Sequence, residues 1–213
     1  MSQSLAVLLL LALLVLLLAL MAAQLRRPTG WFGRRVMAAL LNEGNKALLD
    51  AALDTAAPRA GSRVLDVGFG GGYTLERVAP VVAPERVAGV ELSEAMIAAV
   101  RDRCGDAFDL RLADAAALPF PDASFDVVLS VSTIYFWPDP TRVLKPGGRV
   151  VQGYRSGLVF RMTPLTWFGF RLHGDRRIGR LLEEAGLAAA IRAPRSDEKI
   201  AVGTRPRIGE PQA

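Results

Sequence analysis

A glycine-rich stretch follows an acidic residue at the end of a short apolar run. Asp66, Gly68, Gly70 and Gly72 form a D-x-G-x-G-x-G pattern directly after the β-branched run at residues 63–67, before a helix-like segment. Glycine is needed where the backbone takes a positive φ or approaches a ligand closely, and a following helix presents unpaired N–H groups. The glycines alone indicate either a ligand-binding loop or an ordinary tight turn. Asp66 favours a ligand with a cationic group, because its carboxylate would repel a pyrophosphate.

Two further acids end the next two apolar runs. Glu91 stands 23 positions after Gly68, a spacing that resembles that of the ribose-binding acid in dinucleotide-binding folds. A carboxylate can accept hydrogen bonds from both hydroxyls of a ribose, whereas the alternative for Glu91 is a surface acid at a strand end. Asp114 can accept from an exocyclic amine such as adenine N6, and Ala115 leaves a backbone N–H open to a ring nitrogen. These spacings favour a ligand that contains adenosine.

Cysteine and histidine are too scarce in this chain for disulfides or for a metal site built on these residues. Cys104 is the only cysteine and His173 the only histidine, so the chain has no internal disulfide and no metal site is expected. The net charge of +5 is modest and interspersed with acids, and it lacks a dense basic stripe with interleaved aromatics. No nucleic-acid partner is expected, although this charge would suit an anionic membrane surface.

Seven strand-like runs alternate with helical patterns along the second part of the chain. Right-handed crossovers between such runs predict an α/β fold, with a Rossmann-like, mostly parallel seven-stranded sheet and helices on both faces. We expect one or two helices over residues 36–57, interrupted near residues 42–44. The expected strands lie at residues 63–67, 86–90, 109–113, 125–130, 148–152, 188–193 and 199–204.

The first residues form an apolar segment without charge. Residues 5–23 are nineteen consecutive apolar residues, enough for one transmembrane helix. A cleaved signal peptide is disfavoured because no basic residue precedes the segment and Leu20 or Met21 would occupy the −3 position of a cleavage site. A buried helix is disfavoured because the segment has no polar face. Arginines follow the segment and none precedes it, so the positive-inside rule predicts a single-pass membrane protein with a cytoplasmic C-terminal domain.

Four motifs follow one another along the chain: VLDVGFGGG (64–72), GVELSEAM (89–96), ADAAALPFPDASFDVV (113–128) and RVLKPGGR (142–149). In this order and at this spacing, they resemble the class I methyltransferases that depend on S-adenosylmethionine (SAM), and most closely the small type 11 branch. The resemblance covers about residues 60–152. Together with the apolar N-terminal segment, it divides the chain into a transmembrane anchor (1–25), a juxtamembrane and N-terminal helical segment (26–58), a SAM-dependent methyltransferase domain (59–206) and a tail (207–213).

The resemblance also implies roles for individual residues. Asp66 and the glycines would line the methionine part of SAM, Glu91 the ribose, and Asp114 and Ala115 the adenine. Leu92 would pack near the ring, and Ser130 would lie near the transferred methyl group. Tyr135 is the candidate for orienting an acceptor.

One segment departs from the family pattern. Between strands four and five the family has about ten more residues, which form a helix, so we expect no helix longer than about two turns between Ser130 and Gly148. Residues 157–174 are apolar and aromatic, and they occupy the place where the family varies its acceptor lid. Together with the apolar N-terminus, they favour a small, lipophilic acceptor delivered from the membrane.

The sequence therefore predicts a membrane-bound methyltransferase that transfers the methyl group of SAM to a small or lipid acceptor at the cytoplasmic face. Two alternatives stay open. One is a degenerate SAM-binding domain that is tethered to the membrane and has no turnover. The other is a nicotinamide-dependent oxidoreductase, which shares the fold class and the acid at the end of the second strand.

Overall fold

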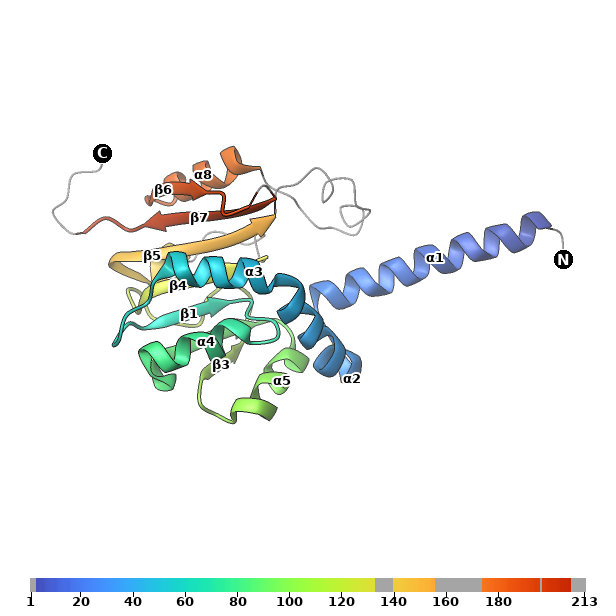
Figure 1. The fold of residues 1–213 in the computed structure, drawn as a ribbon, viewed down its shortest axis with the longest axis horizontal. Helices are drawn as coiled ribbons and strands as arrows, with labels where there is room; N and C mark the ends of the chain where they lie inside the picture. The colour runs from blue at the N-terminus through green and yellow to red at the C-terminus, as the bar shows by residue number, and fades with distance from the viewer. Residues whose placement is uncertain (1–2, 133–139, 156–173, 196, 208–213) are drawn as a thin grey trace.

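A computed structural model describes residues 3–132, 140–155, 174–195 and 197–207. Within these residues, seven strands form one sheet in the order β3-β2-β1-β4-β5-β7-β6, with β7 antiparallel to both of its neighbours (Figure 1). The predicted fold class is therefore confirmed. The strands are β1 Val64–Val67, β2 Val87–Glu91, β3 Asp109–Leu112, β4 Phe125–Val131, β5 Leu144–Arg155, β6 Ala188–Arg192 and β7 Glu198–Thr204.

Helices cover both faces of the sheet. The longer helices α3 (Ala38–Ala56), α4 (Tyr73–Val82) and α5 (Glu94–Cys104) bury apolar side chains in the core on one face. Helix α8 (Asp175–Glu184) buries Ile178 and Leu182 in the core on the other face. The remaining elements in the described part are α1 Gln3–Arg26, α2 Gly30–Phe32, the π-helix η1 Gly33–Met37, the 3-10 helix η2 Pro84–Arg86 and α6 Pro140–Val143.

Local sequence explains how the central elements form. All four residues of β1 are buried, as expected for a strand covered on both faces of a parallel sheet. The side chain of Ser93 accepts a hydrogen bond from the Met96 N–H and caps α5, and Glu94 stands in the first turn, where an acid favours the helix dipole. Ser93 is thus the N-cap of α5.

Helix α3 differs from the prediction, because it runs without interruption through residues 42–44. Gly44 costs an exposed helix only about 0.5–1 kcal/mol relative to alanine. Burial of Leu48, Ala52 and Ala56 against the sheet outweighs that cost. Local propensity alone therefore predicted a break that tertiary packing removes.

The connection between β4 and β5 is short. Strand β5 begins at Leu144, which pairs with Phe125, and not near Gly148 as predicted; an irregularity in the register follows before Arg149 pairs with Val127. In the described part of this connection the helix α6 has four residues, as expected for a shortened crossover. Residues 133–139 lie outside the described residues, so they leave the rest of this expectation untested.

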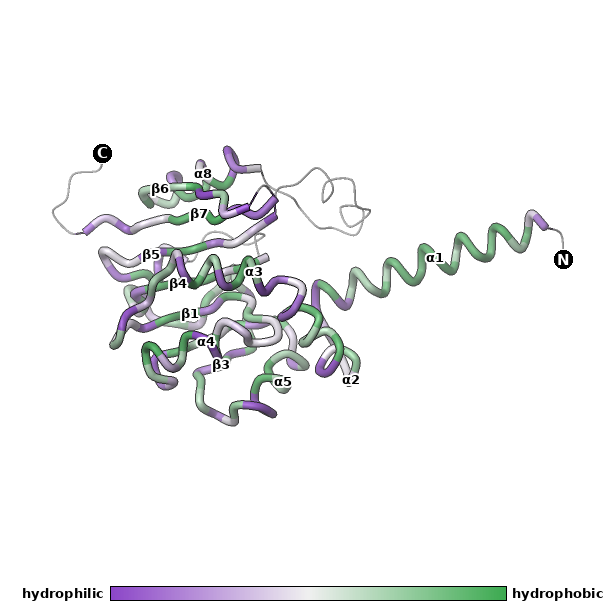
Figure 2. The backbone as a smooth tube through the Cα atoms, in the orientation of Figure 1, coloured by the Kyte–Doolittle hydropathy of each residue, from purple (hydrophilic) through white to green (hydrophobic). Residues whose placement is uncertain are grey.

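The N-terminal helix α1 is apolar along its length and projects from the side of the molecule where the carboxyl ends of the parallel strands lie (Figures 1 and 2). Its most apolar window has a mean hydropathy of 3.3, and 6% of that window is buried. Its 24 residues span about 36 Å, which exceeds the roughly 30 Å hydrocarbon core of a bilayer. Length and composition are sufficient for a membrane span, although a signal sequence passes the same test.

Helix α3 packs directly on the loop that follows β1. The Asn42 side-chain amide donates to the Gly71 carbonyl oxygen at 3.1 Å. A Cβ atom at Gly71 would clash with the Ala38 carbonyl oxygen and with the Asn42 side chain. The absence of a side chain at Gly71 therefore permits the close approach of helix and loop.

We predict that Gly71→Ala destabilises the protein by about 1–3 kcal/mol, because the added methyl group forces α3 away from the loop. Gly44→Ala is the matched control: nothing lies within 4 Å of a Cβ atom there, so this change in α3 should stabilise the protein by about 0.5–1 kcal/mol. Chemical denaturation of both variants measures the difference. Equal stability of the two variants would contradict the observed packing.

Candidate functional site

In the loop between β1 and α4, three backbone N–H groups donate hydrogen bonds to other groups of the protein. Gly68 N–H donates to the Val90 carbonyl oxygen at 2.8 Å, and Gly72 N–H donates to the Phe69 carbonyl oxygen at 2.9 Å. Gly70 N–H donates to Oε2 of Glu91 at 3.0 Å. Three glycine N–H groups that would face a pyrophosphate in a dinucleotide site are thus already engaged.

Glu91 joins the ends of β1 and β2. Its Oε1 accepts from the N–H groups of Leu92 (2.8 Å) and Ser93 (3.2 Å), while its Oε2 accepts from Gly70. Burial raises the pKa of this carboxyl, and the three backbone donors oppose that rise. Since a carboxylate has about four acceptor positions, Oε2 retains capacity for a ligand hydroxyl.

Asp66, in β1 just before the same loop, is a second acid of the candidate site. Its side chain is buried, and the Thr74 hydroxyl in the first turn of α4 donates to its Oδ2. Burial, and then the nearby Glu91 carboxylate, raises the pKa of Asp66 from 3.8 to about 8. Because a cation favours the charged form, a positively charged ligand would stabilise this carboxylate.

The ends of β2 and β3 lie side by side, since Glu91 pairs with Leu112. Beyond them, Oδ1 of Asp114 accepts from the Ala116 N–H at 2.9 Å, which leaves Oδ2 for another donor. Asp114 is exposed and Ala115 is buried. Leu92 is 37% exposed and presents an apolar surface at the same edge. The predicted residues at the ends of β1, β2 and β3 are therefore brought to one edge of the sheet.

Ser130 lies on the neighbouring strand β4 and pairs in register with Gln152 of β5. Both side chains are buried, and the amide of Gln152 has no hydrogen-bond partner in the described part of the chain. Gln152 was missed from the sequence, where the one signal was a polar residue within the apolar run of the fifth strand. Tyr135 and the segment at 157–173 lie outside the described residues.

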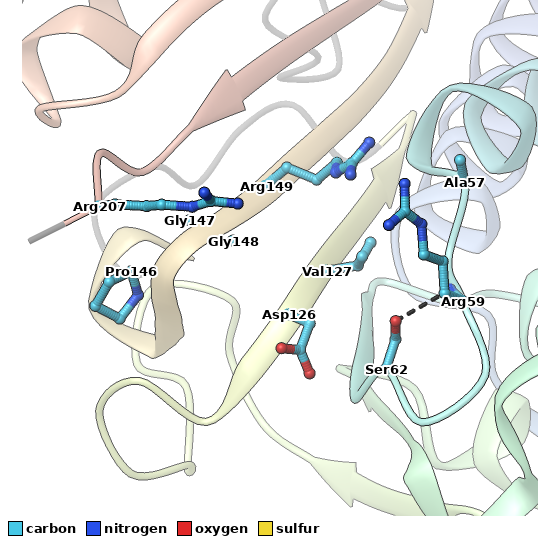
Figure 3. Close-up of a pocket in the computed structure, with 10 residues that line it drawn as sticks. All are labelled: Ala57, Arg59, Ser62, Asp126, Val127, Pro146, Gly147, Gly148, Arg149 and Arg207. Atoms are coloured by element: carbon cyan, nitrogen blue, oxygen red, sulfur yellow. Dashed lines mark hydrogen bonds between the residues drawn. The ribbon is translucent and has the colours of Figure 1, made fainter. Parts of the chain in front are cut away.

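A separate small cavity lies at the opposite, amino-terminal end of β4 and β5. It has a volume of about 180 Å³, and its lining includes Arg59, Arg149 and Arg207 (Figure 3). Asp126 at the start of β4 also lines it. This cavity is distant from the glycine loop and forms no part of the candidate site. Among the described residues, no group of three or more metal-ligating side chains is placed to hold an ion.

Comparisons with known proteins show what the chain is similar to. Residues 65–153 match a family model described as "Methyltransferase domain". The chain is 36% identical over 127 residues to 27-O-demethylrifamycin SV methyltransferase of Amycolatopsis mediterranei, covering 54% of this chain and 46% of that protein. It is 44% identical over 101 residues to demethylmenaquinone methyltransferase of Tropheryma whipplei, covering 43% and 41%. The chain thus spans about half the length of these relatives.

A solved structure shows the same fold. A SAM-dependent methyltransferase from Aquifex aeolicus superposes with a TM-score of 0.63 at 18% identity, covering 78% of this chain and 96% of that one. At this identity, the superposition shows that the two chains share a fold. The match to the methyltransferase-domain model runs from β1 into β5, so this part of the chain is similar to that family.

The raised pKa of Asp66 gives a prediction for the protein without ligand. A carboxyl whose folded-state pKa exceeds its unfolded value contributes fully to stability below the unfolded pKa, and the contribution is lost as pH rises through the folded pKa. Between about pH 4 and about pH 8, the unfolding free energy should therefore fall by up to about 1.4 kcal/mol per pH unit. Urea denaturation of wild type and Asp66→Asn at pH 5 to 8 measures this slope.

The Asp66→Asn variant should lack that fall, since an amide does not titrate. Asp106→Asn is the control, because Asp106 is an exposed acid. It should keep the wild-type slope. Parallel pH profiles for wild type and Asp66→Asn would contradict the assignment of the raised pKa to Asp66.

Proposed function

We propose that this chain is a SAM-dependent methyltransferase that acts on a small, lipophilic acceptor. One observation carries the proposal: two carboxylates flank a glycine loop whose N–H groups are occupied within the protein. Such a loop suits a ligand with a cationic group and a ribose diol. It is poorly suited to the pyrophosphate of a nicotinamide cofactor, and this disfavours the oxidoreductase alternative.

Each candidate residue has a chemical role in this proposal. Asp66 offers a buried carboxylate to the positively charged methionine part of SAM. Oε2 of Glu91 accepts from the ribose, while Asp114 Oδ2 accepts from the adenine amine and the Ala115 N–H donates to a ring nitrogen. Leu92 covers one face of the adenine. The donor and acceptor groups at this edge of the sheet therefore fit SAM.

SAM supplies an electrophilic methyl group on a sulfonium, so the reaction is an in-line displacement. The protein's part is to bind, to orient and to exclude water, since alignment of two reactants supplies much of the rate enhancement. Ser130 lies on β4, next to β1, and Gln152 lies on β5, one strand further along the sheet; both offer polar groups to an acceptor. Gln152 is suited to this task because its buried amide can both donate and accept.

The lipophilic nature of the acceptor is supported by two features. A relative that shares 44% identity over 101 residues is named for demethylmenaquinone, a lipophilic quinone. The apolar helix α1 emerges on the side of the carboxyl edge where the candidate site lies (Figure 1). We propose that α1 spans the membrane once, with the methyltransferase domain in the cytoplasm, so that the site faces the bilayer surface.

Replacement of Glu91 tests the cofactor assignment. Glu91→Ala removes an acceptor of charge-assisted hydrogen bonds to the ribose, and we expect a net loss of about 2–3 kcal/mol after partial replacement by water. SAM affinity should fall roughly 30- to 150-fold. Asp114→Ala should weaken SAM less, because it removes one bond to an exposed amine. Calorimetric titration of both variants with SAM and with NAD measures these effects.

The loss of the Gly70 contact makes a stability control necessary. Thermal melting must show that Glu91→Ala is folded at the titration temperature. Unchanged SAM affinity in the folded variant would remove the central support for the assignment. Binding of NAD in place of SAM would establish the oxidoreductase alternative.

Membrane attachment is tested by fractionation of cells that produce the full chain. The full chain should stay with membranes after a high-salt wash, because apolar burial of α1 does not depend on ionic strength. A shortened chain that starts at Pro28 should be soluble, and a reporter fused to the C-terminus should be cytoplasmic. Recovery of a shortened, secreted form would show that α1 is a cleaved signal.

A further inference from the structure

A groove lies between the end of α1 and the first turns of α5, apart from the candidate cofactor site. Its volume is about 740 Å³. One wall comes from residues 27–35 and the other from Glu94, Ala95 and Ala98. Nothing in the proposed methyl transfer uses this groove.

The groove is preformed by local hydrogen bonds. The Gln24 side chain bonds both the hydroxyl and the N–H of Thr29, at 2.9 and 3.0 Å. The Ser93 hydroxyl donates to the Pro28 carbonyl oxygen and ties the turn to the start of α5. Arg34 of η1 forms an ion pair with Asp102 and so holds the other end of this wall against α5. The turn after α1 is therefore fixed on the methyltransferase domain.

The charge of the groove favours an anion. Arg27, Arg34 and Arg35 line it, against one acid, Glu94. Within the described residues, the side chains of Arg27 and Arg35 form no hydrogen bond or ion pair, and both residues are exposed. Two guanidinium groups are thus available to a ligand, and arginine is well suited to phosphate.

The apolar surroundings favour a lipid as the source of that phosphate. Trp31 lines the groove and is 72% exposed, and Phe32 beside it is 40% exposed. Exposed aromatic rings next to a long apolar helix are typical of the headgroup level of a membrane. A phosphate bound at Arg27 and Arg35 would place its acyl chains alongside α1.

We infer that this groove binds the headgroup phosphate of an anionic phospholipid. The inference rests on the proposed membrane attachment of α1. A lipid bound there would hold residues 27–35 against α5, and the Ser93 contact connects that wall to the strand end that carries Glu91. The lipid thereby fixes the orientation of the methyltransferase domain relative to the membrane.

The test uses the full chain in uncharged detergent with short-chain lipids as probes. Titration with dihexanoylphosphatidylglycerol should raise the melting temperature saturably, whereas dihexanoylphosphatidylcholine and inorganic phosphate should bind at least tenfold more weakly. In Arg27→Gln/Arg35→Gln, affinity for the anionic lipid should fall about 10- to 30-fold, since each basic residue near an anionic surface contributes roughly fivefold. Arg176→Gln/Arg180→Gln removes the same charge from exposed positions on α8 and should bind as the wild type does.

Three outcomes would overturn the inference. They are equal affinity for the two lipids, equal affinity for inorganic phosphate, and lipid binding by Arg27→Gln/Arg35→Gln as tight as that of the α8 control. Calorimetry with SAM separates this result from the proposed function, because neither arginine contacts the cofactor residues and SAM affinity should stay within about twofold. The high-salt membrane wash separately tests attachment through α1.

Discussion

The Glu91 carboxylate is the interaction on which the site depends. It accepts from Gly70 in the loop after β1 and from Leu92 and Ser93 after β2, so one side chain fixes the two loops that border the site. Its proximity also raises the pKa of the buried Asp66, which adds to the effect of burial. Because the Gly70 N–H is engaged, the loop lacks a pyrophosphate cradle and presents carboxylates instead. We attribute the proposed preference for SAM to how the loop is held, since the same fold class serves both dinucleotides and SAM.

The segment before the methyltransferase domain forms part of the structure around that loop. Asn42 and the backbone of Ala38 pack on Gly71, while Pro28 bonds to Ser93 at the start of α5. The apolar helix is therefore connected to the cofactor edge through a short, hydrogen-bonded turn and not through a free linker. This arrangement brings α2 and the end of α1 to the side of the domain where the carboxyl end of β1 lies (Figure 1).

Much of the fold was predictable because strands of a covered parallel sheet are short apolar runs bounded by turn residues. The strands predicted at residues 63–67, 86–90 and 199–204 match β1, β2 and β7 to within one residue at each end. The break predicted at residues 42–44 was wrong, since packing of α3 on the sheet is absent from local sequence. The start of β5 was also placed too late, because pairing with Phe125 is a long-range contact. For the same reason, the backbone contacts of Glu91 had no signal in the sequence, and the only signal of Gln152 was a polar residue within an apolar run.

Transfer of a labelled methyl group from SAM to a membrane extract is the most direct test of the account. The full chain should transfer label to a lipid-soluble product, and mass spectrometry of that product should show the gain of one methyl group. Glu91→Ala should slow this transfer at SAM concentrations below saturation. Tight binding of SAM without label in any product would contradict the proposed function and establish a tethered SAM-binding domain without turnover.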